Sequence, residues 1–70
     1  MPDTTLIHKA NQIAAYFEAY PSPRAEQGVE DHIRKFWEPR IRRRLLALPE
    51  EPLHPLVRKA AARLRADDPV

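Results

Sequence analysis

Proline sets the limits of every regular element that this chain can form. The 70 residues include eight prolines and a single glycine. Proline lacks a backbone N–H and disfavours helical geometry in the residue before it, so it ends a helix, yet it is well tolerated at the first helical position. The prolines divide the chain into successive segments, and each can be tested separately for the 3.6-residue periodicity of an amphipathic helix.

The first segment has the pattern of an amphipathic helix. It is predicted from about Thr4 to Tyr20, because Pro21 must stop it, and Asp3, Thr4 or Thr5 can cap its first turn. A single stripe of the helix surface holds its apolar side chains, which are Leu6, Ile7, Ala10, Ile13, Ala14 and Phe17.

Two amide side chains, Asn11 and Gln12, flank this stripe. Asn11 could hydrogen-bond a neighbouring helix end or the backbone of a partner. Polar side chains at such positions more often border the core and bond to nearby backbone or water, and we favour that interpretation.

A second helix is predicted from about Pro23 to Trp37. Ser22 followed by Pro23 is typical of an N-cap with proline at the first helical position. The buried stripe of this helix is expected to be Val29, Ile33 and Phe36. Gly28 in its interior costs about 1 kcal/mol relative to alanine, which predicts that a backbone or a large side chain approaches closely there.

The segment from Pro39 predicts either a third helix or a bent continuation of the second, and the segment from Pro55 predicts a further helix. From about Pro39 to Leu48, one face carries Ile41, Leu45 and Leu48, and the additional apolar residue Leu46 hints at an interface. The link 49–55 is too rich in proline to be helical, and Pro55 can open a last helix with an inner face of Leu56, Val57, Ala60 and Leu64.

No segment alternates between apolar and polar residues as a strand does. The expected fold is therefore all-α, a small bundle of three to four short helices. We expect one domain over residues 1–70, with a core of about 4–65 and a short frayed tail at 66–70.

Groups that could carry chemistry are scarce. There is no cysteine, and the three histidines lie in different segments without the spacing of metal ligands. One glycine is too few for a phosphate-cradling loop, and the only serine, Ser22, is explained as a cap. We therefore expect no catalytic, cofactor-binding or metal-binding residue, and hence no enzyme activity of the chain alone.

The composition also indicates where and with what the chain works. No apolar run approaches the roughly 18–20 residues of a membrane span, and no secretory signal is visible, so we expect a soluble cytoplasmic protein without membrane contacts. A core of this size rarely supplies more than about 3–5 kcal/mol of net stability, which favours a partner or self-association as a homodimer.

The segment HIRKFWEPRIRRR, residues 32–44, holds six basic side chains and one acid around Phe36 and Trp37. Such a run could neutralise phosphates and stack on bases, dock on another protein, or form a solvated basic face. The net charge is only +2, and the link before residue 39 lacks the glycine-bearing turn of a helix-turn-helix. A small nucleic-acid-binding protein is therefore the weaker alternative.

Three stretches together resemble a known family. These are ANQIAAYFEAYP (10–21), GVEDHIRKFWEPRIRRRLL (28–46) and HPLVRKAAARL (54–64), and they are similar to the delta subunit of cytoplasmic NAD-dependent formate dehydrogenases. The likeness covers roughly residues 6–64. It departs from the family where Ile41 replaces a common methionine, where His54 replaces a serine that often caps the last helix, and in a shorter linker at 49–53.

The resemblance implies an accessory role. In such enzymes the large subunits hold a molybdenum or tungsten bis-pterin cofactor, iron–sulfur clusters and FMN, oxidise formate and reduce NAD. The delta subunit binds no cofactor of its own and is associated with assembly or full activity of the complex. Contact with an anionic cofactor tail during cofactor insertion is a more speculative version of that role.

The resemblance also gives the arginines a role. Guanidinium groups pair with carboxylates at interfaces, where arginine and tryptophan are favoured anchors. We therefore predict a docking surface for the large subunits formed by Arg34, Trp37, Arg40, Arg43 and Arg44. The competing interpretation is that Trp37 completes the core and the arginines face water.

Overall fold

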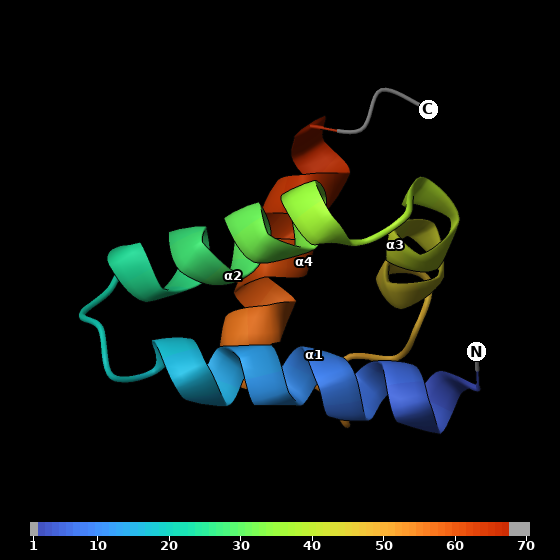
Figure 1. Ribbon diagram of the computed structural model, residues 1–70, viewed down its shortest axis with the longest axis horizontal. Coiled ribbons are helices and arrows are strands. Elements are labelled where there is room, and N and C mark those ends of the chain that lie inside the picture. The colour runs from blue at the N-terminus through green and yellow to red at the C-terminus, as the bar shows by residue number, and fades with distance from the viewer. Residues whose placement is uncertain (1, 68–70) are drawn as a thin grey trace.

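The structure, a computed structural model, describes residues 2–67. These residues form the four helices α1 (Asp3–Phe17), α2 (Arg24–Phe36), α3 (Pro39–Leu46) and α4 (Pro55–Asp67), in that order (Figure 1). No strand occurs between residues 2 and 67, so the all-α prediction is confirmed.

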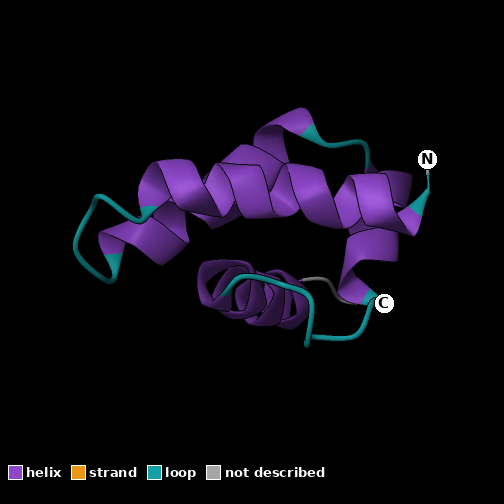
Figure 2. Ribbon diagram, turned by 90° about the horizontal axis from the view of Figure 1, so that it is seen from below, coloured by secondary structure: helices purple, strands orange, loops and turns teal. Residues whose placement is uncertain are grey.

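The helices form two layers. α1 and α2 lie side by side and run in opposite directions, and α4 crosses behind them while α3 closes one end (Figure 1). Turned by 90°, α4 stands in a layer of its own (Figure 2). One face of the α1/α2 layer is therefore covered by α4, and the other face is open.

The core between these layers is aliphatic. Its buried residues are Leu6, Ala10, Ala14, Val29, Ile33, Leu45, Leu48, Leu53, Val57, Ala60 and Leu64. Most of the predicted stripes are thus confirmed, and Ile7, Ile13 and Leu46 are partly buried against this cluster. Phe36 is the exception, because 73% of its surface is exposed.

The position of Phe36 follows from the way in which α2 ends. Trp37 leaves helical geometry with φ −96° and ψ 136°, and its indole packs against the core. Ile41 of α3 also packs against this cluster, and Leu45 of α3 is part of it. The prediction of Phe36 as a core residue is therefore wrong.

Proline also explains where α1 ends. The helix stops at Phe17 rather than near Tyr20. Pro21 has no N–H to donate to the Phe17 carbonyl, which accepts a hydrogen bond from the Tyr20 N–H instead (3.0 Å). The N-terminus also differs from the prediction, since Pro2 is the N-cap and no side chain caps the first turn.

Ser22 does not cap α2. The N-cap is Pro23, which follows a cis peptide bond. The Ser22 hydroxyl donates to the carboxylate of Glu26 instead, at 2.6 and 2.9 Å. This hydrogen bond lowers the pKa of Glu26 below its ordinary value. The prediction of a Ser22 N-cap is therefore wrong.

Gly28 lies where a large side chain of another helix approaches α2 closely, as expected. A Cβ built on this residue would overlap Cδ1 and Cε1 of the Phe17 ring, which comes from α1. Glycine therefore allows α1 and α2 to pack closely at this point, as the sequence predicted.

Asn11 pins the linker between α3 and α4. Its amide nitrogen donates to the Pro52 carbonyl (2.9 Å), and its amide oxygen accepts from the His54 N–H (2.8 Å). The interpretation of Asn11 as a mere border residue is therefore wrong, whereas Gln12 is exposed. His54 in turn accepts a hydrogen bond at its ring Nδ1 from the Leu56 N–H (3.0 Å), so an imidazole supplies a cap in the first turn of α4.

Pro55 opens α4 as predicted. The helix includes Ala66 and Asp67, two residues of the segment that the sequence assigned to a frayed tail, and the rest of that segment lies outside the described residues. α3 is shorter than predicted and ends at Leu46, although Leu48 is still buried.

Candidate functional site

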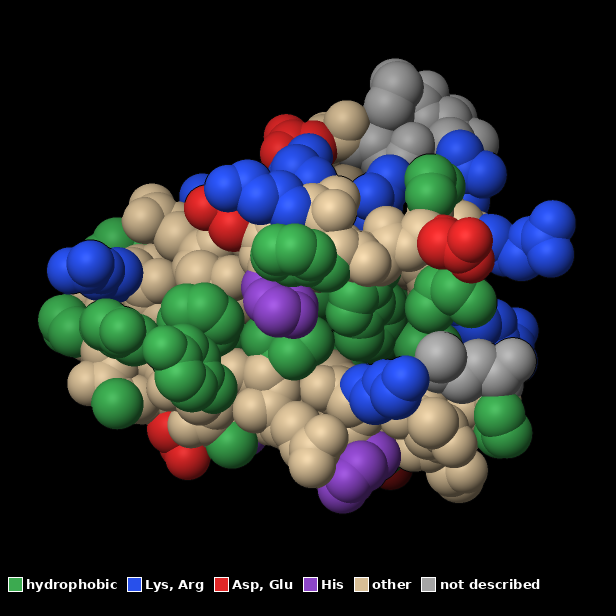
Figure 3. Space-filling model, in the orientation of Figure 1, with side chains coloured by type: hydrophobic (Ala, Val, Ile, Leu, Met, Phe, Trp, Pro, Cys, Tyr) green, Lys and Arg blue, Asp and Glu red, His purple; other side chains and the backbone are tan. Residues whose placement is uncertain are grey.

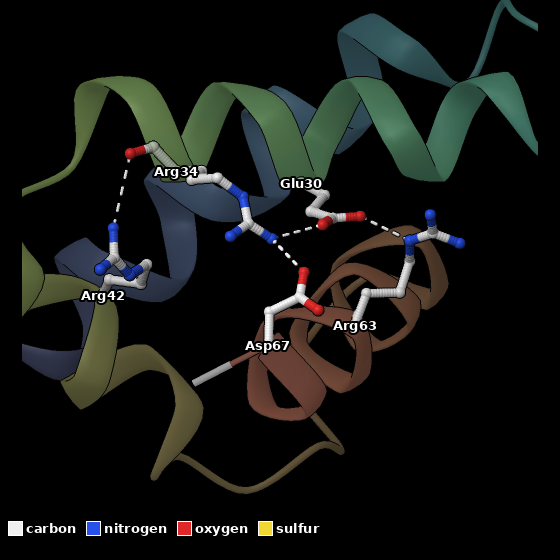
Figure 4. A network of polar contacts seen from close by, with 5 residues as sticks. All are labelled: Glu30, Arg34, Arg42, Arg63 and Asp67. Atoms are coloured by element: carbon white, nitrogen blue, oxygen red, sulfur yellow. Dashed lines mark hydrogen bonds and ion pairs between the residues drawn. The ribbon is translucent and has the colours of Figure 1, made fainter. Parts of the chain in front are cut away.

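Two of the five predicted docking residues take part in ion pairs within the chain. Arg34 of α2 donates from one nitrogen to Glu30 (2.5 Å) and to Asp67 of α4 (2.8 Å), and its carbonyl accepts from Arg42 (Figure 4). Arg44 of α3 donates from Nε and Nη2 to the carboxylate of Asp3 in α1, at 2.9 and 2.7 Å. The hydrogen bond from Arg44 lowers the pKa of Asp3.

The carboxylate of Glu30 is the centre of the network in Figure 4. It is buried, with only 8% of the residue exposed, and it also accepts from Arg63 Nε of α4 (2.5 Å). Burial alone would raise the pKa of Glu30, but the hydrogen bonds from Arg63 and Arg34 outweigh it and lower that pKa. Glu30 therefore stays ionised and ties α2 to α4.

The other three predicted residues are placed differently. Arg40 and Arg43 project from α3 into solvent, and neither side chain forms a hydrogen bond or ion pair with another residue in 2–67. Trp37 is half-buried against the core. The predicted surface thus contains two free guanidinium groups, two that are oriented by internal carboxylates, and one anchored indole.

An apolar groove on the open face of the α1/α2 layer adjoins Trp37. Its central hollow has a volume of about 590 Å³ and is lined by Lys9, Gln12, Ile13, Tyr16, Phe17, His32 and Trp37. A second hollow of about 320 Å³ shares Lys9 and Trp37 with the first, and a third of about 290 Å³ shares Phe17. We call these three hollows together the aromatic groove.

All five aromatic residues of the chain line this groove. Tyr16, Phe17 and Trp37 line the central hollow, Phe36 lines the second and Tyr20 the third, and none of the five is fully buried. Figure 3 shows hydrophobic side chains spread across this face around a histidine, with basic side chains above and beside them.

Of the residues that line the groove, only Trp37 was predicted as a docking residue. Phe36 was assigned to the core, and Tyr16 and Tyr20 were given no role. A signal was present, because the aromatic residues fall into two short clusters, 16–20 and 36–37, at the C-terminal ends of α1 and α2. Since these helices run in opposite directions, the clusters lie toward opposite ends of the groove, and only tertiary packing leaves both of them on the open face.

Among residues 2–67 no group of three or more histidine, aspartate or glutamate side chains is placed to hold a metal ion. None of the helices in the same range has both the length and the apolarity that a membrane span requires.

Comparison with known proteins gives one match. The model of the family described as NADH-dependent formate dehydrogenase delta subunit FdsD matches residues 5–61. Neither the search of curated proteins nor that of solved structures gives a match. Because the matched segment covers most of α1, all of α2 and α3 and the first half of α4, this chain belongs to the family of formate dehydrogenase delta subunits.

Proposed function

We propose that this chain is a non-catalytic accessory subunit that docks on the large subunits of a cytoplasmic NAD-dependent formate dehydrogenase and supports assembly, cofactor insertion or full activity of the complex. The family match over residues 5–61 is the observation that carries the proposal. The large subunits would hold the molybdenum or tungsten bis-pterin cofactor, the iron–sulfur clusters and FMN that the family resemblance implies, and would bind NAD.

The docking surface that we propose centres on Trp37, Arg40 and Arg43. The two arginines are exposed and have no carboxylate partner among the described residues, so their N–H groups are available to a partner. Trp37 offers a large amphipathic contact whose position is fixed by the core, which lowers the entropic cost of binding.

Arg34 and Arg44 complete this surface. Both guanidinium groups are held by internal carboxylates, and their side chains remain 40% and 57% exposed. Each guanidinium group keeps N–H groups that are not used by its internal ion pair. Because the ion pair orients the guanidinium, it also fixes the direction of these remaining N–H groups. No described feature favours the nucleic-acid alternative, and we do not pursue it.

Co-purification tests this function. The large subunits, expressed with this chain carrying an affinity tag, are expected to be retained, and formate-dependent NAD reduction should be higher with the chain than without it. The double substitution Arg40→Glu with Arg43→Glu is expected to abolish retention while the helical circular dichroism stays unchanged. Arg40→Glu and Arg43→Glu are also tested singly, each against Lys59→Glu, a charge reversal on an exposed position of α4.

Retention of the large subunits by the double variant would contradict the arginine assignment. Failure of the wild-type chain to retain any large subunit would contradict the accessory function itself. The small core also favours a dimer of the isolated chain, which would use an exposed surface in another way. Analytical ultracentrifugation distinguishes such a dimer from docking on the large subunits.

A further inference from the structure

The aromatic groove is an unusual surface for a chain of this size. Tyr16 is 68% exposed and Phe36 is 73% exposed, although the core would gain more stability from such rings than from the alanines it contains. Clustered exposed aromatic side chains mark interaction sites, because rigid rings contribute most of the energy at protein interfaces.

The groove is elongated in the direction of α1. The second hollow begins at Leu6, the central hollow runs from Lys9 to Phe17, and the third hollow ends at Tyr20. With a rise of about 1.5 Å per residue, this distance is roughly 20 Å, the length of a helix of about four turns. An amphipathic helix bound in a groove contacts it with apolar residues at i, i+3, i+4 and i+7, which suits three hollows in a row.

Charge indicates what such a helix must carry. Lys9 is the only lysine or arginine lining the central hollow, and no carboxylate lines it, whereas Glu38 lines the second hollow and Arg24 and Asp31 line the third. The Lys9 ammonium group is exposed and forms no ion pair with any residue in 2–67. A carboxylate on the bound helix would complete this site, since charge complementarity across an interface fixes orientation and register.

The same feature argues against a second copy of the chain as the occupant. In a two-fold symmetric dimer whose axis passes through the central hollow, this hollow of one copy meets the same hollow of the other. Two lysines would then face each other where the central hollow itself supplies no carboxylate. A helix of a different protein with a carboxylate at this point avoids the repulsion.

We propose that the aromatic groove binds an amphipathic helix of a formate dehydrogenase large subunit, with apolar residues in the three hollows and a carboxylate opposite Lys9 of the central hollow. This inference rests on the proposed function and adds a second contact area to the arginine surface, with Trp37 belonging to both. The groove and the arginines both contribute affinity, and the arginines also supply charge steering and orientation.

The test compares two double variants with equal added charge. Tyr16→Glu with Phe36→Glu alters exposed residues of the groove, so the fold should persist. Ala15→Glu with Ala62→Glu alters exposed residues outside the groove and is the matched control. Binding of each variant to purified large subunits, measured by surface plasmon resonance, should weaken by about tenfold or more for the groove variant and stay within about twofold for the control.

Lys9→Glu tests the predicted carboxylate. It should weaken binding by about fivefold at low salt, with a smaller effect at high salt, because exposed ion pairs are screened. Circular dichroism of every variant shows whether the helices are retained. If the groove double variant unfolds, Tyr16→Ser or Phe36→Ser is used in its place.

The outcomes separate this inference from the proposed function. Full affinity of the groove variant would overturn the inference and leave the function standing, as would equal weakening of the matched control. A wild-type dimer that the groove substitutions dissociate would assign the groove to a second copy and overturn the inference as well. Absence of any binding by the wild-type chain would instead overturn the function on which the inference depends.

Discussion

Individual side chains join parts of this small molecule that are far apart in the sequence. Asn11 bonds to Pro52 and His54, 41 and 43 positions away, and Arg44 bonds to Asp3 across 41 positions. Because the linker before α4 is rich in proline and has few backbone donors, the two hydrogen bonds from Asn11 are an important constraint on its path.

Asn11→Ala is expected to lower the free energy of unfolding by about 1–2 kcal/mol, because a carbonyl and an N–H of the linker lose their partner. Gln12→Ala, at the neighbouring exposed position, should change it by less than about 0.5 kcal/mol. Urea unfolding followed by circular dichroism measures both variants. Equal effects would show that the contacts of Asn11 with the linker contribute nothing specific.

Gly28→Ala should destabilise the fold by about 1 kcal/mol even though alanine is the better helix former, because its Cβ displaces the Phe17 ring. In a Phe17→Ala background the same substitution should stabilise the fold by about 1 kcal/mol, since only the helix propensity then remains. Thermal unfolding of the four proteins in this double-mutant cycle gives the comparison. A gain in stability from Gly28→Ala in both backgrounds would contradict the close packing of α1 on α2.

At the scale of elements, α2 and α4 are joined by aliphatic packing and by the ion pairs of Glu30. Arg34 lies one turn away on the same helix, whereas Arg63 and Asp67 come from α4 (Figure 4). Glu30 is buried and both arginines are about half-exposed, so the network has one desolvated charge with two partners that remain in contact with water.

Glu30→Gln should lower the free energy of unfolding at pH 7 by about 1–2 kcal/mol, since the arginines lose a charged acceptor but stay solvated. The pKa of Glu30 lies below its ordinary value of 4.5 in the folded chain, so its contribution is present above that pH and is lost as the pH falls through the lowered pKa. The difference between wild type and variant should therefore shrink with acidification. Urea unfolding between pH 7 and 3 measures it.

Asp31→Asn is the control for this experiment, because Asp31 is an exposed neighbour with no ion pair among the described residues. It should leave the stability nearly unchanged at every pH. A difference between Glu30→Gln and wild type that stays constant from pH 7 to 3 would mean that packing, and not ionisation, gives Glu30 its role.

The sequence was sufficient for the elements because the signals that define them are local. Prolines and apolar periodicity predicted three to four helices, with limits within a few residues of the observed ones, and Gly28 predicted a close approach. Ser22 and Phe36 were misassigned because their roles depend on neighbours. The carboxylate of Glu26 accepts the hydrogen bond of the Ser22 hydroxyl, and Trp37 rather than Phe36 packs against the core.

At the scale of the whole molecule, the fold places small aliphatic residues inside and its aromatic residues on one open face. Periodicity cannot predict this division, because it identifies an apolar side of a helix but not whether another layer covers it. The sequence predicted a docking surface in the basic segment, yet two of its arginines form ion pairs with Glu30, Asp67 and Asp3. Tertiary structure therefore moves the emphasis of the candidate site from the arginines toward the rings beside them.

The position of the single tryptophan has a practical consequence. Trp37 borders the central and second hollows of the aromatic groove and is half-buried in the free chain. An occupant of either hollow would exclude water from the indole and move its emission toward the blue. The molecule thus carries an intrinsic fluorescent probe at its candidate site, and occupancy can be followed in unlabelled protein.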